Sequence, residues 1–110
     1  MKRCSHWIDG ILHPPSSDRW LPVFNPSDGR QFAEVATGNV SDVEAAVAAA
    51  QRALPAWSSL ANSQRARWLE KLADALEARI DDFARAESLD AGKPFALARD
   101  IEIPRAISNL

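Results

Sequence analysis

Apolar and polar positions follow different patterns in two parts of the chain, and the change lies near residue 40. Before it, short apolar runs rich in Trp and Phe are separated by Pro, Asp and Gly, which indicates short strands and turns. After it, Ala, Leu, Glu and Arg dominate, and apolar residues recur every three or four positions. Because that spacing places them on one helix face, we expect a hairpin and strands over residues 1–40 and helices over 41–110.

The first part contains extended stretches joined by turns. An Asp-Gly pair separates two apolar pairs within residues 7–12, which predicts a hairpin closed by a type I′ turn. Residues 20–24 are expected to be extended, and Pro22 confines this strand to an edge because proline has no N–H to donate. A second turn is predicted over residues 25–29 and a further extended stretch over 31–36.

The first predicted helix begins at Ser41, because the run from Ser41 to Glu44 has the form of a capping box. We expect this helix to end near Pro55. Its apolar face has helical spacing and consists of Val43, Ala46, Val47, Ala50, Leu54 and Trp57.

A single long helix is predicted from about Ser63 to Gly92, a glycine suited to end a helix, with Pro94 just beyond it. Burial of its apolar stripe would contribute roughly 1.5–3 kcal/mol per side chain. The entropy of ordering the segment offsets most of that gain. The stripe consists of Leu69, Leu72, Leu76, Ile80 and Phe83.

A last helix is predicted from about Phe95. Pro104 lies inside it and should kink it, because the ring clashes with the preceding turn. The apolar pattern continues to Leu110 without a capping signal, so we expect the chain to be truncated.

Composition narrows the class of protein. Of the 110 residues, 46% are hydrophobic and 25% charged, with 13 basic and 15 acidic side chains and a formal net charge of −2. This balance argues against a nucleic-acid partner, which normally meets a basic stripe. No stretch approaches the roughly 18 apolar residues of a membrane span. The one cysteine allows no internal disulfide and no signal peptide is visible, so a cytoplasmic protein is expected.

The most informative polar residues are Glu87 and Asp90, which continue the apolar stripe of the long helix by one turn. A carboxylate on a core-facing stripe needs a partner. Two interpretations stay open: a salt bridge that fixes the helix end, for which Lys93 and Arg99 are the nearby cations, or a bound cation held by Asp90.

Other side chains that could carry chemistry lack the setting for it. His6 and His13 are seven residues apart, without the close further ligands of a zinc site. Cys4 is expected in a frayed terminus without a base beside it. No glycine-rich nucleotide motif or nucleophile elbow occurs. The four tryptophans are expected to pack in the core; they are Trp7, Trp20, Trp57 and Trp68.

Several short motifs occur in a fixed order along almost the whole chain. They are Ile8-Asp9-Gly10, the run Asn25–Gly29, Asp42-Val43 opening an Ala-rich helix, Trp57, and the run Leu89–Pro94. Each motif is weak, but the ordered set resembles the start of NAD(P)-dependent aldehyde dehydrogenases. Residues 96–105, which include Ile103-Pro104-Arg105, are similar to the branch that oxidises 2-aminomuconic and 2-hydroxymuconic semialdehydes.

The resemblance implies an α/β fold in which this chain supplies the leading strands and first helices of a Rossmann-like cofactor domain. It implies an aldehyde substrate, NAD as cofactor and a homo-oligomer for the intact enzyme. There, a thiolate attacks the aldehyde, hydride passes to NAD, and water hydrolyses the thioester. The catalytic thiol, the general-base glutamate, the oxyanion asparagine and the nicotinamide segment have no matching positions here. The chain should therefore contain no catalytic or cofactor-binding residue and be inactive alone.

One site of the family does map onto this sequence. Members bind a monovalent cation, Na⁺ or K⁺, through the residues that align with Asp90 and with the backbone carbonyl of Phe24. The alternative to a dehydrogenase segment is a small self-contained helical interaction module without catalysis. It would need no further domain, so the coding DNA downstream of Leu110 discriminates the two.

Overall fold

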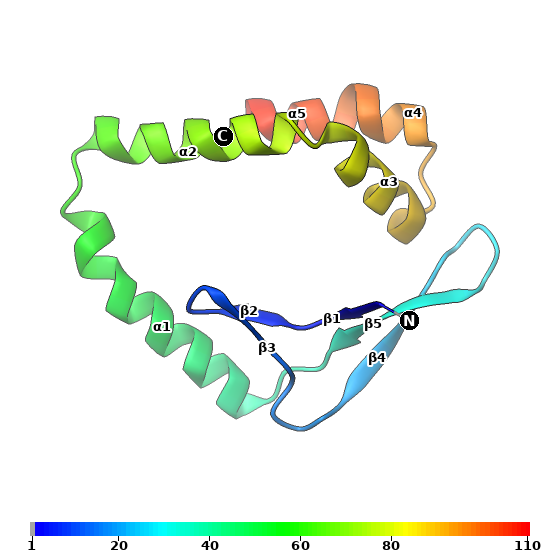
Figure 1. Ribbon diagram of the computed structural model, residues 1–110, viewed down its shortest axis with the longest axis horizontal. Coiled ribbons are helices and arrows are strands. Elements are labelled where there is room, and N and C mark those ends of the chain that lie inside the picture. The colour runs from blue at the N-terminus through cyan, green and yellow to red at the C-terminus, as the bar shows by residue number, and fades with distance from the viewer. Residues whose placement is uncertain (1) are drawn as a thin grey trace. The chain divides into compact units, whose positions relative to one another are not determined.

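The computed structural model describes residues 2–110 and divides the chain into two compact units. The first unit comprises Met1–Phe24 with Arg30–Ser59, and the second comprises Asn25–Gly29 with Leu60–Leu110. The described strands all lie before residue 40, and the described helices begin at Val40 (Figure 1), as the change of pattern predicts.

The first unit contains a three-stranded sheet. Strand β5 (Gln31–Ala36) lies between β1 (Lys2–Cys4), to which it is parallel, and β4 (Trp20–Phe24), to which it is antiparallel. The prediction that Pro22 lies in an edge strand is confirmed, since β4 pairs with β5 alone among the described strands. The expected fraying around Cys4 is wrong, because Cys4 lies in β1 and pairs with Val35 of β5. Its side chain is exposed.

A separate hairpin joins β2 (His6–Ile8) to β3 (Ile11–His13). Asp9 has a φ of 54° and Gly10 a φ of 78°. Both are the positive values that a two-residue type I′ turn requires, so the predicted hairpin is confirmed. The turn sets the register that places Trp7 opposite Leu12.

Helix α1 (Val40–Ser58) starts earlier and ends later than predicted. The capping box is formed by Asn39 and Asp42, each side chain bonding the other's backbone N–H, and not by Ser41 and Glu44. Pro55 does not end the helix, which continues beyond it to Ser58. Ser59 closes the end by donating its N–H to the Pro55 carbonyl at 3.1 Å.

The single helix predicted from Ser63 is two helices in the second unit, α2 (Asn62–Glu77) and α3 (Ile80–Ala91). They are separated at Arg79, whose φ of −126° and ψ of 26° are not helical. Neither glycine nor proline marks this break, so the continuous apolar spacing conceals it. The predicted stop is confirmed, since Gly92 caps α3 with a left-handed φ of 71°.

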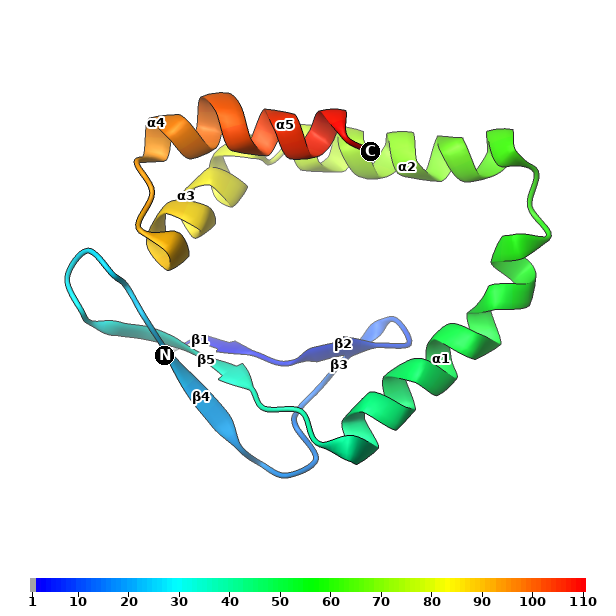
Figure 2. The same ribbon diagram turned by 180° about the vertical axis from the view of Figure 1, so that it is seen from behind.

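The last helical segment starts at Phe95, as predicted, and turns back along α2 (Figures 1 and 2). It comprises α4 (Phe95–Leu97), the π-helical turn η1 (Ala98–Glu102) and α5 (Ile103–Ser108). Pro104 stands in the first turn of α5 and does not end the helix. The wider π turn, in which Ile103 donates to the Ala98 carbonyl, accommodates the proline.

The buried residues among residues 2–110 are Pro15 and four alanines: Ala33, Ala49, Ala84 and Ala98. The expected core position of Trp7, Trp57 and Trp68 is therefore wrong for this chain by itself. Leu72 is 48% exposed, and the tryptophans expected in the core reach 69% exposure at Trp7. Within residues 2–110, no helix combines the length and apolar character needed to cross a membrane.

Candidate functional site: the C-terminal end of helix α3

Phe24 and Asp90, the two residues expected at a cation site, lie in different units. Phe24 is the last residue of β4, beside an irregularity of the β4–β5 ladder, and its side chain is 52% exposed. Asp90 lies in the last turn of α3 and is exposed. The prediction that Asp90 faces a core is therefore wrong in this chain, and Glu87, one turn earlier, is half-buried.

Lys93 links the end of α3 to the π turn through two carboxylates. Its Nζ lies 2.9 Å from Glu87 Oε1 and 2.7 Å from Glu102 Oε2. Hydrogen bonds to Glu102 and then to Glu87 raise the pKa of the Lys93 ammonium. The salt-bridge interpretation is thus confirmed for Glu87. A further hydrogen bond joins α3 to the segment after it, since the Ser88 Oγ–H donates to the Lys93 carbonyl at 2.7 Å.

The second nearby cation, Arg99, also bonds other acids. Its Nε lies 2.8 Å from Asp81 Oδ1, and its Nη1 lies 3.2 Å from Asp100 Oδ1. The bond to Asp81 is the largest cause of the raised pKa of Arg99. Neither Lys93 nor Arg99 therefore neutralises Asp90, which corrects the pairing expected from sequence.

Within residues 2–110, Asp90 has no hydrogen-bond or ion-pair partner for its carboxylate. It also lies where the last helix carbonyls concentrate negative partial charge, which is unfavourable for an anion. Hard cations bind to oxygen ligands, and carboxylates and backbone carbonyls are the oxygen ligands that proteins offer most often. The described residues contain no cluster of three or more His, Cys, Asp or Glu side chains that could hold a metal. A cation here would therefore depend on Asp90 and carbonyl oxygens.

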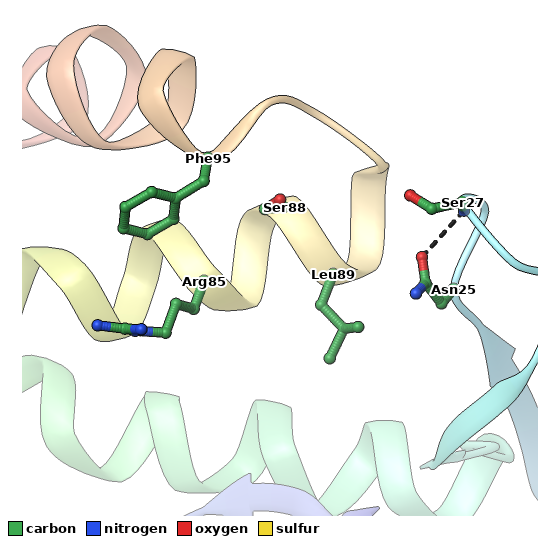
Figure 3. Close-up of a pocket in the computed structure, with 6 residues that line it drawn as sticks. All are labelled: Asn25, Ser27, Arg85, Ser88, Leu89 and Phe95. Carbon is green, nitrogen blue, oxygen red and sulfur yellow. Dashed lines mark hydrogen bonds between the residues drawn. The ribbon is translucent and has the colours of Figure 1, made fainter.

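An open groove of about 370 Å³ lies beside α3, within the second unit (Figure 3). Arg85 lies over the Phe95 ring, with its Cζ 5.5 Å from the ring centroid. On the loop side, Asn25 Oδ1 accepts the Ser27 N–H at 2.9 Å. The side chains that line the groove are Asn25, Ser27, Arg85, Ser88, Leu89 and Phe95. They include no nucleophile paired with a base.

Gly92 allows the loop 25–29 to approach α3 closely. A β-carbon at Gly92 would lie 2.7 Å from Pro26 Cγ, which is closer than real contacts of this kind. Two features therefore require glycine at position 92: its positive φ and the close approach of Pro26. The sequence identifies the first requirement, but Pro26 is distant in the chain and the second could not be predicted.

The first unit contains a polar cluster around Asp42 that was not predicted from the sequence pattern. The carboxylate accepts N–H groups from Asn39 at 3.0 Å and Ser16 at 3.1 Å, and His6 Nε2 lies 3.7 Å away. The Asn39 N–H is the largest cause of the lowered pKa of Asp42. Asn39 followed three residues later by an acid was the available signal. The hydrogen bonds of this cluster hold the start of α1.

The described residues contain no glycine-rich loop of the kind that binds a dinucleotide. The glycines stand far apart, at 10, 29, 38 and 92, and form no phosphate-binding loop. The first turns of α1 and α3 contain acids, Asp42 in α1 and Asp81 and Asp82 in α3, whereas the first turn of α2 contains none. The carboxylates of α1 and α3 would repel a phosphate at those two helix ends, and no step involving the cofactor is assigned to the described residues.

Comparison with known proteins gives consistent matches across almost the whole chain. The family model described as "Aldehyde dehydrogenase family" matches residues 13–110. Human 2-aminomuconic semialdehyde dehydrogenase is 42% identical over 104 residues, 94% of this chain and 21% of that protein. The 2-hydroxymuconic semialdehyde dehydrogenase of Pseudomonas sp. (strain CF600) is 41% identical over 110 residues, 99% of this chain and 23% of that protein.

Solved structures match equally well. The crystal structure of PnpE in complex with nicotinamide adenine dinucleotide has a TM-score of 0.92 at 38% identity, covering 94% of this chain and 21% of PnpE. The chain therefore spans about a fifth of the length of the proteins it matches. The mixed α/β fold corresponds to the N-terminal part of such structures, and the alternative of a self-contained helical module is not supported. On these matches, the chain belongs to the aldehyde dehydrogenase family.

Proposed function

We propose that this chain forms the N-terminal part of the cofactor domain of a longer, NAD-dependent aldehyde dehydrogenase. The complete enzyme would oxidise a semialdehyde of the muconic type to a carboxylic acid, as a cytoplasmic homo-oligomer. The observation that carries the proposal is the family match over residues 13–110, together with relatives named as muconic semialdehyde dehydrogenases.

Within that enzyme, the chain would act as scaffold. Its large apolar side chains support this role, because faces such as those of Trp7, Leu12 and Trp68, all more than half exposed, suit burial against further protein. The described residues offer no nucleophile with its base and no dinucleotide loop. We therefore infer that the chain alone is inactive.

The same proposal includes a monovalent cation, Na⁺ or K⁺, bound by the Asp90 carboxylate and the Phe24 carbonyl. The support within the second unit is the unpartnered Asp90 at the negative end of α3. Such a cation would be structural, since it would offset the charge of Asp90 and need not touch the substrate.

The activity is tested with the complete protein that contains this chain. NADH formation would be followed with 2-hydroxymuconic semialdehyde and, as a control, with an unbranched aliphatic aldehyde of similar length. We expect kcat/KM to be at least about tenfold higher for the muconic substrate, a discrimination of roughly 1.4 kcal/mol. Equal values would exclude the muconic assignment, and no NADH with any aldehyde would exclude the dehydrogenase.

The inactivity of the chain alone is tested by titrating the 110-residue chain with NAD in a calorimeter. No measurable heat of binding is expected, whereas the complete protein should bind. Micromolar affinity of the chain alone would show that a dinucleotide site lies within these residues.

A further inference from the structure

The hairpin turn Asp9-Gly10 combines features that favour a covalent change of its own backbone. An aspartate followed by glycine can cyclise, because glycine has no side chain to obstruct attack by its own nitrogen on the aspartate carboxyl. Both residues are exposed, and a β-carbon at Gly10 would meet nothing within 4 Å. The turn therefore has room for the rearrangement.

The attacking nitrogen is also available. Within residues 2–110, no acceptor is found for the Gly10 N–H, which lies in the tip of a two-residue turn outside the β2–β3 ladder. The chain contains a second Asp-Gly pair, Asp28-Gly29, which serves as an internal comparison. There the Gly29 N–H donates to the Asn25 carbonyl at 2.8 Å, so its nitrogen is engaged.

One contact opposes the reaction at Asp9. Arg52, on α1 in the same unit, holds Asp9 Oδ2 at 3.0 Å from its Nη2. This contact restrains the carboxyl carbon from turning toward the Gly10 nitrogen. Both side chains of the ion pair are more than 60% exposed, so the restraint is weak and screened by salt.

We propose that Asp9-Gly10 is a site of spontaneous isomerisation to isoaspartate, restrained by Arg52. The Gly10 nitrogen forms a bond to Asp9 Cγ, and the C–O bond of the carboxyl breaks with loss of water. Water then opens the five-membered succinimide. Attack at its α-carbonyl leaves the main chain running through the aspartate side chain, while attack at the other carbonyl restores aspartate. The net change adds and removes one water, so no other reactant is needed.

The product would alter the hairpin. Isoaspartate inserts one extra methylene into the backbone of a two-residue turn and removes the positive-φ geometry of Asp9. The register that pairs Ile8 with Ile11 depends on that turn. The hairpin contact with α1, which β2 and the Asp9–Arg52 pair provide, would weaken as well.

The test follows isoaspartate at both Asp-Gly pairs in the complete protein during prolonged incubation at neutral pH. Proteolytic peptides would be analysed by mass spectrometry with electron-based fragmentation, which distinguishes the two isomers of equal mass. We expect isoaspartate at Asp9 to form several-fold faster than at Asp28. Equal or faster formation at Asp28, or none at Asp9, would overturn the proposal.

Two variants and one condition sharpen the test. Arg52→Ala should raise the rate at Asp9 several-fold and leave Asp28 unchanged, whereas Asp9→Glu should abolish the product at position 9. In concentrated urea the two aspartates should react at similar rates, because the structural difference is lost. An Arg52→Ala variant in which both sites accelerate equally would show general unfolding and contradict the role given to Arg52.

Discussion

Two carboxylates at helix ends in this chain differ in their hydrogen-bond partners and in their position in the helix dipole. At the start of α1, Asp42 accepts hydrogen bonds from Asn39 and Ser16 and lies at the positive end of the helix dipole. At the end of α3, Asp90 has no partner within residues 2–110 and lies at the negative end. The comparison teaches that hydrogen bonds account for the position of Asp42, while the unfavourable position of Asp90 is the observation behind the proposed cation.

The two ends are also closed by different means. The start of α1 depends on side-chain oxygens that accept backbone N–H groups. The end of α3 depends on the backbone freedom of Gly92 and on the Lys93 bridge to Glu87 and Glu102. Substitutions at the start of α1 should therefore act through lost hydrogen bonds. A substitution of Gly92 at the end of α3 should act through backbone strain.

The largest effect is expected for Gly92→Ala. The left-handed φ costs roughly 1–2 kcal/mol for a residue with a β-carbon, and contact with Pro26 should bring the total to about 2–4 kcal/mol. Native-state hydrogen exchange of the α3 amides in the complete protein measures this loss. Gly29→Ala is the matched control, since Gly29 has a φ of 68° but open space around it. Equal losses at the two glycines would contradict the role of Pro26.

A smaller effect is expected at the other end for Asn39→Ala. Loss of this N-cap should reduce the stability of α1 by about 1 kcal/mol. Exchange of the first α1 amides is the measurement, and Asn39→Ser, which keeps an accepting oxygen, should retain most of the protection. If serine and alanine lowered protection equally, the side-chain cap would not be what holds this end.

The contribution of Asp42 should depend on pH. Its pKa is lowered below the ordinary value of 3.8, first by the Asn39 N–H, so the folded state prefers the charged carboxylate. The stabilisation is therefore complete above the unfolded pKa and is lost as the pH falls through the folded pKa. Protection of α1 should differ most between the parent and Asp42→Asn near neutral pH, and the difference should shrink below about pH 4. A difference that stays constant down to pH 2 would contradict this linkage.

The smallest effect, and the one that decides the role of Asp90, is expected for Asp90→Asn in the complete protein. With a bound cation, the substitution should lower the melting temperature and abolish its dependence on K⁺, measured against a bulky organic cation. Without one, removing a charge from the negative end of α3 should stabilise by roughly 0.3–1 kcal/mol. A lower melting temperature of Asp90→Asn would therefore indicate a bound cation, and a higher one would indicate that none is bound. Lys93→Ala should leave any K⁺ dependence intact, because Lys93 pairs with Glu87 and Glu102.

Local chemistry was sufficient to predict the features that one short segment controls. Asp9-Gly10 indicates the hairpin, Pro22 an edge strand, and Gly92 the end of α3, because each depends on the backbone preferences of one or two residues. The ordered motifs likewise led to the correct family. Asp90 was singled out from its place on a helix stripe, although Asp90 itself is exposed in this chain.

Tertiary structure decided what depends on groups that are distant in sequence. The break at Arg79 between α2 and α3 has no glycine or proline to announce it. The choice of Lys93 between several acids, and the approach of Ser16 to Asp42 or of Pro26 to Gly92, follows only from the folded path of the chain. The sequence by itself determined the local backbone geometry and the family, because short-range sterics and ordered motifs are written in neighbouring residues. The fold decided which charged groups form ion pairs and which carboxylate has no partner. Ion pairs and close contacts depend on distances in space, which the spacing of residues along the sequence does not contain.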